Sequence, residues 1–291
     1  MDLTKINIEK LFSRLFADVP IKIIESSHGI DQEVKIVITK NRNYVLKKPR
    51  REKYVIGNEV FAAMKWGEIG IPVPKTIWHD KELLIQEFID GEKFGKVKLS
   101  KNNKMKIYYQ VGKIMKKMHS VETKGYANIK GKGVGEFSSS EEYKNWALRR
   151  VKTSFSIIKK RKLMSDADLV FLKKEVERLI KYFGKNKFVL THQDLVEDHI
   201  FVKDNKLVGI IDFGDIKSDD PMADFRKIAR NNEDYFKEVI RGYGQVNKDN
   251  IELHQLLVYL YRVYNYYRRK DNKNLKGLVE QIKKEYIEPY F

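Results

Sequence analysis

The first part of the chain alternates short apolar runs with polar turns, a pattern that predicts a small lobe built mainly from strands. Residues 6–16 and 57–66 place apolar side chains at helical spacing. Strands are predicted at residues 21–25, 34–39, 43–48, 76–79 and 83–88. We therefore expect residues 1–90 to form one lobe, with the chain leaving it near residues 89–92.

Long helical patterns dominate the rest of the sequence. Helices are predicted at residues 103–119, 141–160, 166–183, 222–230, 234–243, 251–267 and 275–286. A Gly- and Lys-rich stretch at residues 123–137 predicts a loop. The whole pattern predicts an α+β fold with two lobes, a mainly β N-lobe and a larger, mainly helical C-lobe over residues 91–291.

Two aspartates at the ends of a predicted hairpin are the most informative feature. Asp194 follows the apolar run 188–190, and Asp212 ends the apolar run 207–211. Between them, residues 200–202 and 207–211 read as strands joined by the turn 203–206, so both carboxylates should lie near one point. One carboxylate can deprotonate a hydroxyl while the other holds a metal ion, as kinase-type phosphoryl transfer requires. A lone aspartate in a loop more often caps a turn, but that alternative must account for the whole string, including His192, which would brace the loop.

A nucleotide also needs a cation and a base-binding strand. Strand alternation places Val45 and Lys47 on one face, so Val45 could cover the base while Lys47 reaches the phosphates. Glu59, early in the next helix, could pair with Lys47; the alternative is a surface lysine and a surface glutamate. Gln86 and Phe88 lie in a strand that would bind the base edge, and Ser27 lies in a turn that would cover the phosphates. Adenine and guanine fit this pattern equally.

Composition and charge limit the cellular location and the kinds of partner that the sequence allows. The 291 residues contain no Cys, which excludes disulfides and thiolate metal sites and favours a cytoplasmic location. No signal peptide or membrane-spanning run is predicted, and we expect a monomer without a membrane partner. The net charge of +18 could indicate a nucleic-acid partner, and the aromatic and basic run 264–270 could stack on bases. Because lysines are scattered along predicted helices, we interpret the charge as a solvated surface.

These motifs together resemble the aminoglycoside phosphotransferase family, which shares the two-lobed protein-kinase-like fold. The aminoglycoside 2″-phosphotransferase branch is similar in carrying H-x-D-x-x-x-x-H, here residues 192–199, followed by I-I-D-F-G-D, here residues 210–215. Residues 46–49, 58–60 and 220–225 also look like that branch.

The resemblance implies roles for single residues. Asp194 would be the catalytic base, and His199 and Asp212 would hold one or two Mg²⁺ ions on ATP or GTP. Lys47 would bind phosphate with Glu59 as its partner, and Asp224 would brace the catalytic loop. An imidazole is a poor match for a hard cation, so a packed structural histidine is the alternative for His199.

The acceptor site has fewer sequence signals than the nucleotide site. Aminoglycosides are polycations, and their sites are acidic. The carboxylates available for such a site are Glu197, Asp198, Asp215, Glu233 and Asp234, although Arg230 and Lys237 flank the last two. Helix capping and solvation explain these carboxylates equally well. The alternatives are therefore a kinase of choline, a sugar or an amino acid, or a non-catalytic protein that binds nucleotide or nucleic acid.

Overall fold

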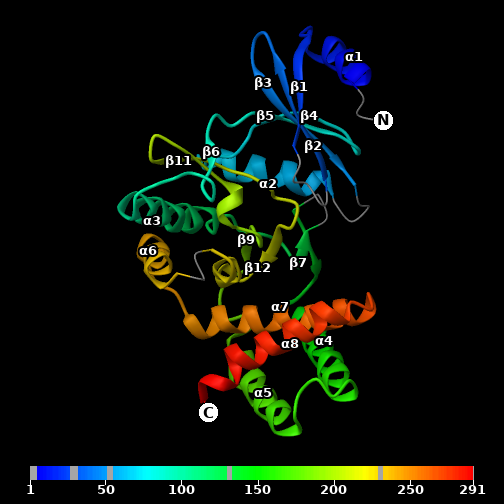
Figure 1. Cartoon of the computed structure of the whole chain (residues 1–291), viewed down its shortest axis with the longest axis vertical. Coiled ribbons are helices and arrows are strands. Elements are labelled where there is room, and N and C mark those ends of the chain that lie inside the picture. The colour runs from blue at the N-terminus through cyan, green and yellow to red at the C-terminus, as the bar shows by residue number, and fades with distance from the viewer. Residues whose placement is uncertain (1–4, 27–31, 51–54, 130–132, 229–231, 291) are drawn as a thin grey trace.

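An antiparallel sheet with two helices forms the N-terminal lobe of the computed structural model, which describes residues 5–26, 32–50, 55–129, 133–228 and 232–290 (Figure 1). The strands lie in the order β1-β2-β3-β5-β4. The bounds of this lobe's elements are α1 Lys5–Phe16, β1 Pro20–Ser26, β2 Gln32–Thr39, β3 Asn43–Pro49, α2 Ile56–Glu68, β4 Thr76–His79 and β5 Leu84–Glu87. Each predicted strand and helix of this lobe is present, within a few residues.

The two faces of this sheet have different partners. Apolar residues of α1 pack on the outer face against alternate residues of β3 and β5, among them Tyr44, Leu46 and Ile85. Val45 and Lys47 therefore belong to the opposite face. Gln86 pairs in register with Val45 and is buried there. The inner face is thus free of α1 and turns toward α2, whose Glu59 contacts Lys47.

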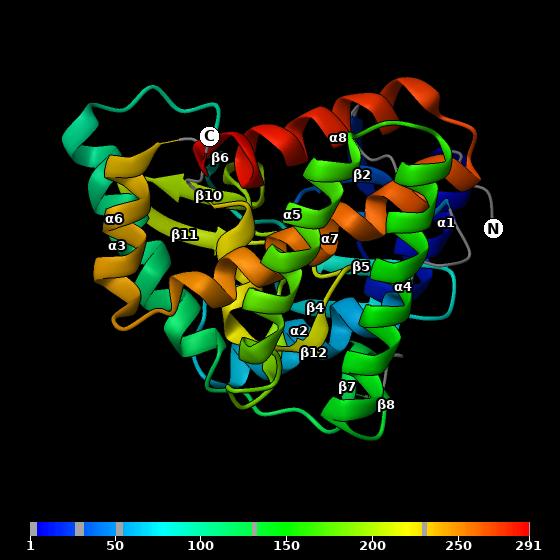
Figure 2. The same cartoon turned by 90° about the horizontal axis from the view of Figure 1, so that it is seen from below.

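The C-terminal lobe is mainly helical and contains two small sheets, ordered β11-β10-β6 and β8-β7-β12-β9 (Figure 2). Its helices are α3 Lys101–Met118, α4 Ser140–Lys160, α5 Asp166–Leu179, α6 Glu233–Tyr243, α7 Lys248–Arg268 and α8 Asn272–Tyr286. Its strands are β6 Glu92–Lys93, β7 Tyr126–Ile129, β8 Gly135–Phe137, β9 Val189–Thr191, β10 Ile200–Lys203, β11 Lys206–Ile210 and β12 Lys217–Asp219. Short 3₁₀ helices are η1 Ile180–Tyr182, η2 Glu197–His199, η3 Pro221–Arg226 and η4 Glu288–Tyr290. The α+β, two-lobed prediction is confirmed.

Helix starts in this lobe follow the sequence closely, because polar side chains cap them. Ser100, Ser139 and Ser165 each accept a hydrogen bond from the backbone amide three residues later, at the starts of α3, α4 and α5. Asn232 and Asn247 do the same for α6 and α7. Each cap satisfies a backbone donor that the helix cannot, which fixes where the helix begins.

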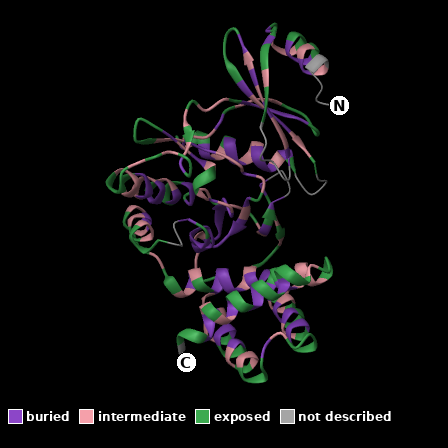
Figure 3. Cartoon of the chain, viewed as in Figure 1, coloured by how far each residue is buried: buried purple, intermediate pink, exposed green. Residues whose placement is uncertain are grey.

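The lobes meet through α2. Trp66 on its inner side is fully buried and donates from Nε1 to the carbonyl of Met118, 3.2 Å away. Its ring also packs edge-on against Phe213, beside Asp212. Figure 3 shows that α2 and the short strands β9 and β12 are largely buried at this junction. The motif residues thus lie where the lobes join.

Close helix packing holds α3 against α6. A β-carbon added to Gly112 would lie 2.1 Å from the carbonyl oxygen of Val239, and one added to Gly242 would lie 2.1 Å from that of Tyr109. Neither position can accept a side chain unless the helices separate. Two glycines on facing helices therefore set the distance between α3 and α6.

Two local predictions are wrong, and a third differs only in the type of its last turn. The predicted loop 123–137 contains β7 and β8, because β7 pairs with β12, a strand distant in sequence that periodicity does not reveal. The helix predicted at 222–230 is the 3₁₀ helix Pro221–Arg226 within the described residues, and its polar side chains contact the catalytic loop. The helix predicted at 166–183 ends at Leu179 and continues as η1.

Candidate active site

The β10–β11 hairpin brings Asp194, His199 and Asp212 together. His199 donates through Nδ1 to the backbone carbonyl of Asp194 at 2.7 Å. Its Nε2 faces Oδ2 of Asp212 at 3.3 Å, and its Nδ1 lies 3.9 Å from Oδ2 of Asp194. Burial lowers the pKa of His199, and the charges of Lys93 and Lys47 lower it further. The charges of Asp212 and Asp198 raise it. A neutral ring that donates through Nδ1 leaves the Nε2 lone pair directed toward Asp212.

Asp224 holds the loop that carries Asp194. Its carboxylate accepts hydrogen bonds from the backbone amides of His192 at 2.8 Å and Gln193 at 2.6 Å. It also lies 3.0 Å from Nε2 of His119. Burial alone would raise the pKa of Asp224, but the hydrogen bond and charge of His119 and His192 lower it. The carboxylate therefore stays ionised and braces the loop, as the family resemblance implies.

His192 supports Asp194 from behind the loop. The backbone amide of Asp194 donates to Nδ1 of His192 at 3.3 Å, so Nε2 carries the proton and donates to the carbonyl of Ile211 at 3.1 Å. The ring is completely buried and stacks on Trp66. His192 thus ties the backbone next to Asp194 to the backbone next to Asp212, and it touches both without facing solvent.

Backbone strain accompanies both carboxylates. Gln193 has φ 68° and Asp212 has φ 70°, in the left-handed region that non-glycine residues seldom occupy. The Gln193 side chain is held by Thr191 at 2.8 Å and by Arg226 at 2.8 Å. Such strain costs about 1–3 kcal/mol per residue and persists where surrounding contacts over-determine it, as at active sites.

The nucleotide candidates lie on the inner face of the N-lobe sheet. Lys47 forms an ion pair with Glu59, and both side chains are buried. Gln86 is 1% exposed, and Phe88 lies just after β5. Ser27 falls outside the described residues. The charge of Lys47 is also one of the causes that lower the pKa of His199, after burial.

A divalent cation would have two protein ligands here. His199 and Asp212 present one nitrogen and one carboxylate oxygen toward the same space. Within the described residues, no cluster of three or more His, Asp or Glu side chains could hold a metal ion. Two ligands fit Mg²⁺ bound jointly with nucleotide phosphates and water, the usual arrangement of this ion at phosphoryl-transfer sites.

The acidic residues predicted for a cationic acceptor have different surroundings. Glu233 pairs with Lys237 at 2.8 Å, and Asp234 pairs with Lys101 at 2.7 Å, both on the exposed surface. Glu197 accepts a hydrogen bond from Tyr108, whose pKa burial raises. Asp198 and Asp215 are exposed.

Lys227 is a site residue that the sequence interpretation missed. Its ammonium group forms an ion pair with Oδ1 of Asp194. Its neighbour Arg226 donates to the carbonyl and side-chain oxygens of Gln193 at 3.2 and 2.8 Å. The available signal was a pair of cations directly after the D-P-x-x-D-F segment, but the sequence does not show where their side chains point.

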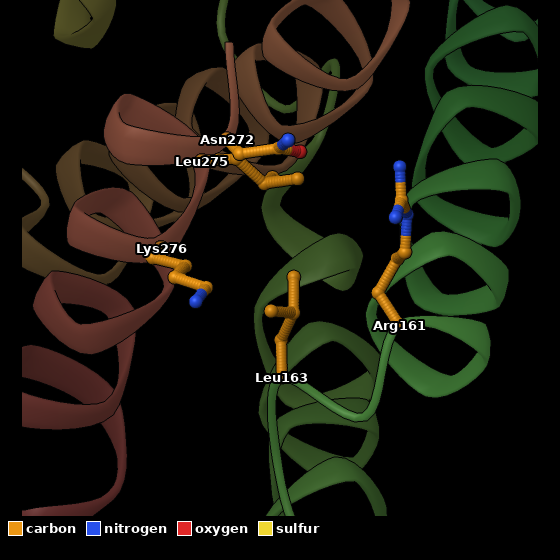
Figure 4. A pocket seen from close by; sticks show the side chains of 5 residues that line it. All are labelled: Arg161, Leu163, Asn272, Leu275 and Lys276. Carbon is orange, nitrogen blue, oxygen red and sulfur yellow. The ribbon is translucent and has the colours of Figure 1, made fainter. Parts of the chain in front are cut away.

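A cavity in the helical part of the C-lobe is lined by none of the predicted site residues. Figure 4 shows its lining from the end of α4 and the start of α8, and its volume is about 220 Å³. The lining residues are Arg161, Leu163, Asn272, Leu275 and Lys276. Because the lining contains cations and no carboxylate, it offers no site for the polycation that the resemblance implies.

The sequence profile of the phosphotransferase enzyme family, APH, matches residues 22–256. No curated protein matches the sequence. Within the part of the chain that the structure describes, every helix is too short or too polar to cross a membrane.

Several solved aminoglycoside phosphotransferases have a similar structure. ADP-bound APH(2″)-Ib is 20% identical, with a TM-score of 0.66, over 96% of this chain and 97% of that one. A thermostable mutant of APH(4)-Ia with AMP-PNP and hygromycin B is 13% identical, with a TM-score of 0.69, over 95% and 97%. APH(2″)-IIIa with GDP and kanamycin is 16% identical, with a TM-score of 0.67, over 96% and 98%. At these identities the likeness establishes the fold.

Proposed function

The chain belongs to the phosphotransferase enzyme family, and we propose that it transfers the γ-phosphoryl group of ATP or GTP to a hydroxyl group of a small molecule. The observation that carries this proposal is the convergence of Asp194, His199 and Asp212 at the end of one hairpin. A base, a metal site and the nearby Lys47 are the parts that phosphoryl transfer needs.

In the proposed reaction the acceptor hydroxyl lies beside Asp194. Its oxygen attacks the γ-phosphorus, a new P–O bond forms, and the bond between the γ-phosphorus and the β–γ bridging oxygen breaks. The hydroxyl proton passes to the Asp194 carboxylate, and the nucleoside diphosphate leaves. Asp194 is fixed by the bracing of its loop through Asp224 and His192, so positioning is built into the fold.

His199 and Asp212 would hold Mg²⁺, which supplies positive charge to the β- and γ-phosphates when bound. Lys47 would bind the phosphates from the opposite lobe, with Glu59 holding its ammonium group in place. Val45 and Gln86 would line the base pocket on the inner face of the sheet. ATP and GTP both remain candidates, and solved relatives of this fold bind ADP, AMP-PNP or GDP.

An aminoglycoside is the acceptor that the sequence resemblance favours. Related structures contain gentamicin, streptomycin, hygromycin B or kanamycin. The exposed Asp198 and Asp215, and Glu197 beside Tyr108, are the carboxylates nearest in sequence to the proposed base and metal ligand. A sugar, choline or an amino acid is the alternative acceptor within the same reaction class.

A panel of hydroxylated acceptors, incubated with labelled ATP and GTP in parallel, tests the proposal. We expect label transfer that needs a divalent cation. Asp194→Asn should reduce turnover by about two orders of magnitude or more, the usual scale for a general base, while nucleotide binding by calorimetry stays nearly unchanged. Asp212→Asn should weaken the cation-dependent binding instead. Undiminished turnover in Asp194→Asn would remove this residue from the mechanism.

A further inference from the structure

Lys227 occupies the place beside Asp194 that an acceptor hydroxyl needs. Its ammonium group contacts Oδ1 of Asp194, and 34% of the side chain is exposed. An incoming hydroxyl must therefore displace this contact or share the carboxylate with it. Any charge that the acceptor carries close to its reacting hydroxyl lies next to a lysine.

The segment that carries Lys227 is fixed to the catalytic loop. Three residues earlier, Asp224 accepts from two consecutive backbone amides of that loop. Arg226 is buried and donates to both oxygens of Gln193, the residue before Asp194. The backbone that carries Lys227 is therefore held to the catalytic loop through the side chains of Asp224 and Arg226, unlike the backbone of a lysine on a free surface helix.

A second cation acts on the same position. Burial, followed by the charge of Arg262 on α7, lowers the pKa of Lys227 to about 8. Burial also lowers the pKa of Arg226, and Arg262 again contributes in the same direction. The contact with Asp194 favours the charged form of Lys227.

Two of the carboxylates that could offset these cations form ion pairs elsewhere, and a third accepts a hydrogen bond. Glu233 and Asp234 are paired with Lys237 and Lys101, and Glu197 binds the hydroxyl of Tyr108. A polycation that approached Asp194 would meet the Lys227 ammonium group, while Asp198 and Asp215 lie exposed on the same segments as the base and the metal ligand. An anionic group on the acceptor would find a cation there instead.

We infer that Lys227 sets the charge of the acceptor, and that this enzyme phosphorylates a hydroxyl compound carrying a carboxylate or phosphate group in preference to a polycation. The inference rests on the proposed function, since it names the substrate class of the same site. Lys227 would release Asp194 when the acceptor binds and pair with the acceptor's anionic group. It would then act as a specificity residue, while Asp194 keeps its role as base.

Matched probes test this inference. Glucose, glucosamine and glucose 6-phosphate share a ring and differ in charge, and kanamycin serves as the polycation. Each is measured as an acceptor with labelled ATP and GTP, and as an inhibitor of the acceptor-independent hydrolysis of nucleotide. The proteins are the wild type, Lys227→Met, Lys227→Glu and Lys173→Met, whose exposed lysine on α5 is a charge-matched control.

For the wild type we expect kcat/KM, or the inhibition constant, to favour the anionic probe over the amino analogue by about 10-fold to 100-fold, the scale of a close charge pair. Lys227→Met should remove this preference mainly through KM, Lys227→Glu should reverse it, and Lys173→Met should leave it unchanged. Tighter binding of kanamycin than of the anionic probe to the wild type overturns the inference, as does indifference to all the probes.

Other outcomes separate failure of this inference from failure of the proposed function. An equal fall in kcat for every probe and for water in Lys227→Met means that Lys227 acts on the transferring phosphoryl group, and this also overturns the inference. Absence of any cation-dependent nucleotide turnover, with hydrolysis as well as transfer missing, means that the proposed function itself has failed. Hydrolysis that needs Asp212 but shows no charge preference among acceptors leaves the proposed function standing without the inference.

Discussion

The Nε2 atom of His199 lies 3.3 Å from Oδ2 of Asp212, while its Nδ1 donates to the carbonyl of Asp194 at 2.7 Å. One imidazole therefore connects the backbone of the proposed base to the proposed metal ligand. Nitrogen is a weaker partner than oxygen for Mg²⁺, whereas imidazole suits later divalent metals better. The side chain at position 199 should consequently influence which cation the site prefers.

His199→Asn should change the cation preference. We expect nucleotide affinity with Mg²⁺ to be kept or improved, because an amide oxygen replaces nitrogen, and affinity with Mn²⁺ to gain less. His199→Ala should weaken nucleotide binding by about tenfold or more with both ions, as loss of a ligand or its close support does. Calorimetric titration of ATP and GTP with each cation provides the measurement. Equal affinity of the wild type and the alanine variant would show that His199 is not a ligand.

Glu59→Gln should destabilise the protein as well as weaken nucleotide binding. It leaves Lys47 buried without its carboxylate, and breaking a buried pair on one side costs about 3–5 kcal/mol. The double variant Lys47→Met/Glu59→Leu removes both charges and should recover most of the free energy of unfolding, but not nucleotide affinity. Urea unfolding and calorimetry separate the two effects. If the double variant is as unstable as the single one, the unpaired charge is not the cause.

The buried His192 should make stability fall in mild acid. Burial lowers the pKa of His192 from its usual 6.5, so below that pH the unfolded chain binds a proton that the folded protein does not. This contribution to stability is complete above about pH 6.5 and is lost as the pH falls, by about 1.4 kcal/mol for each unit between the two pKa values.

Comparison with His192→Gln isolates the effect, because glutamine does not titrate and the other histidines remain. The free energy of unfolding, measured by urea at several pH values from about 7.5 downward, should fall more steeply for the wild type than for the variant. Parallel curves would mean that His192 takes up its proton equally in both states.

Gly112→Ala should separate α3 from α6. The added methyl group would lie 2.1 Å from the carbonyl oxygen of Val239, and overpacking of this kind costs typically about 1–3 kcal/mol. Gly277→Ala on α8 is the matched control, since nothing lies within 4 Å of its added carbon. It should stabilise the protein by about 0.5–1 kcal/mol through helix propensity. Urea unfolding measures both, and similar changes in the two variants would contradict the packing argument.

Much of the fold was predictable because local signals agree with it. The helix predicted at 251–267 is Lys248–Arg268, with Asn247 as its cap. The hairpin between Asp194 and Asp212 was predictable from two apolar runs and a polar turn, and it carries the candidate site. Strands β7 and β12 were not, because each is short and depends on partners far away in sequence.

Local sequence signals also predict only some of the polar contacts around the site. The pairing of Lys47 with Glu59 follows from strand alternation and the position of α2, so the sequence predicts it. The ion pair of Lys227 with Asp194 depends on the 3₁₀ turn at Pro221–Arg226, where periodicity predicts an α-helix. A change from one helix type to the other redirects the side chains that follow, and no local pattern reveals where they point.

The clamp that Asp224 applies to the catalytic loop has a consequence for how this enzyme could acquire new substrates. A base whose loop is held through the consecutive main-chain amides of His192 and Gln193 cannot shift to suit a different alcohol. Adaptation must then fall on residues that contact the base without holding its backbone, such as Lys227. Acceptor choice and chemical competence are thereby separable in this fold, so one can drift while the other stays intact.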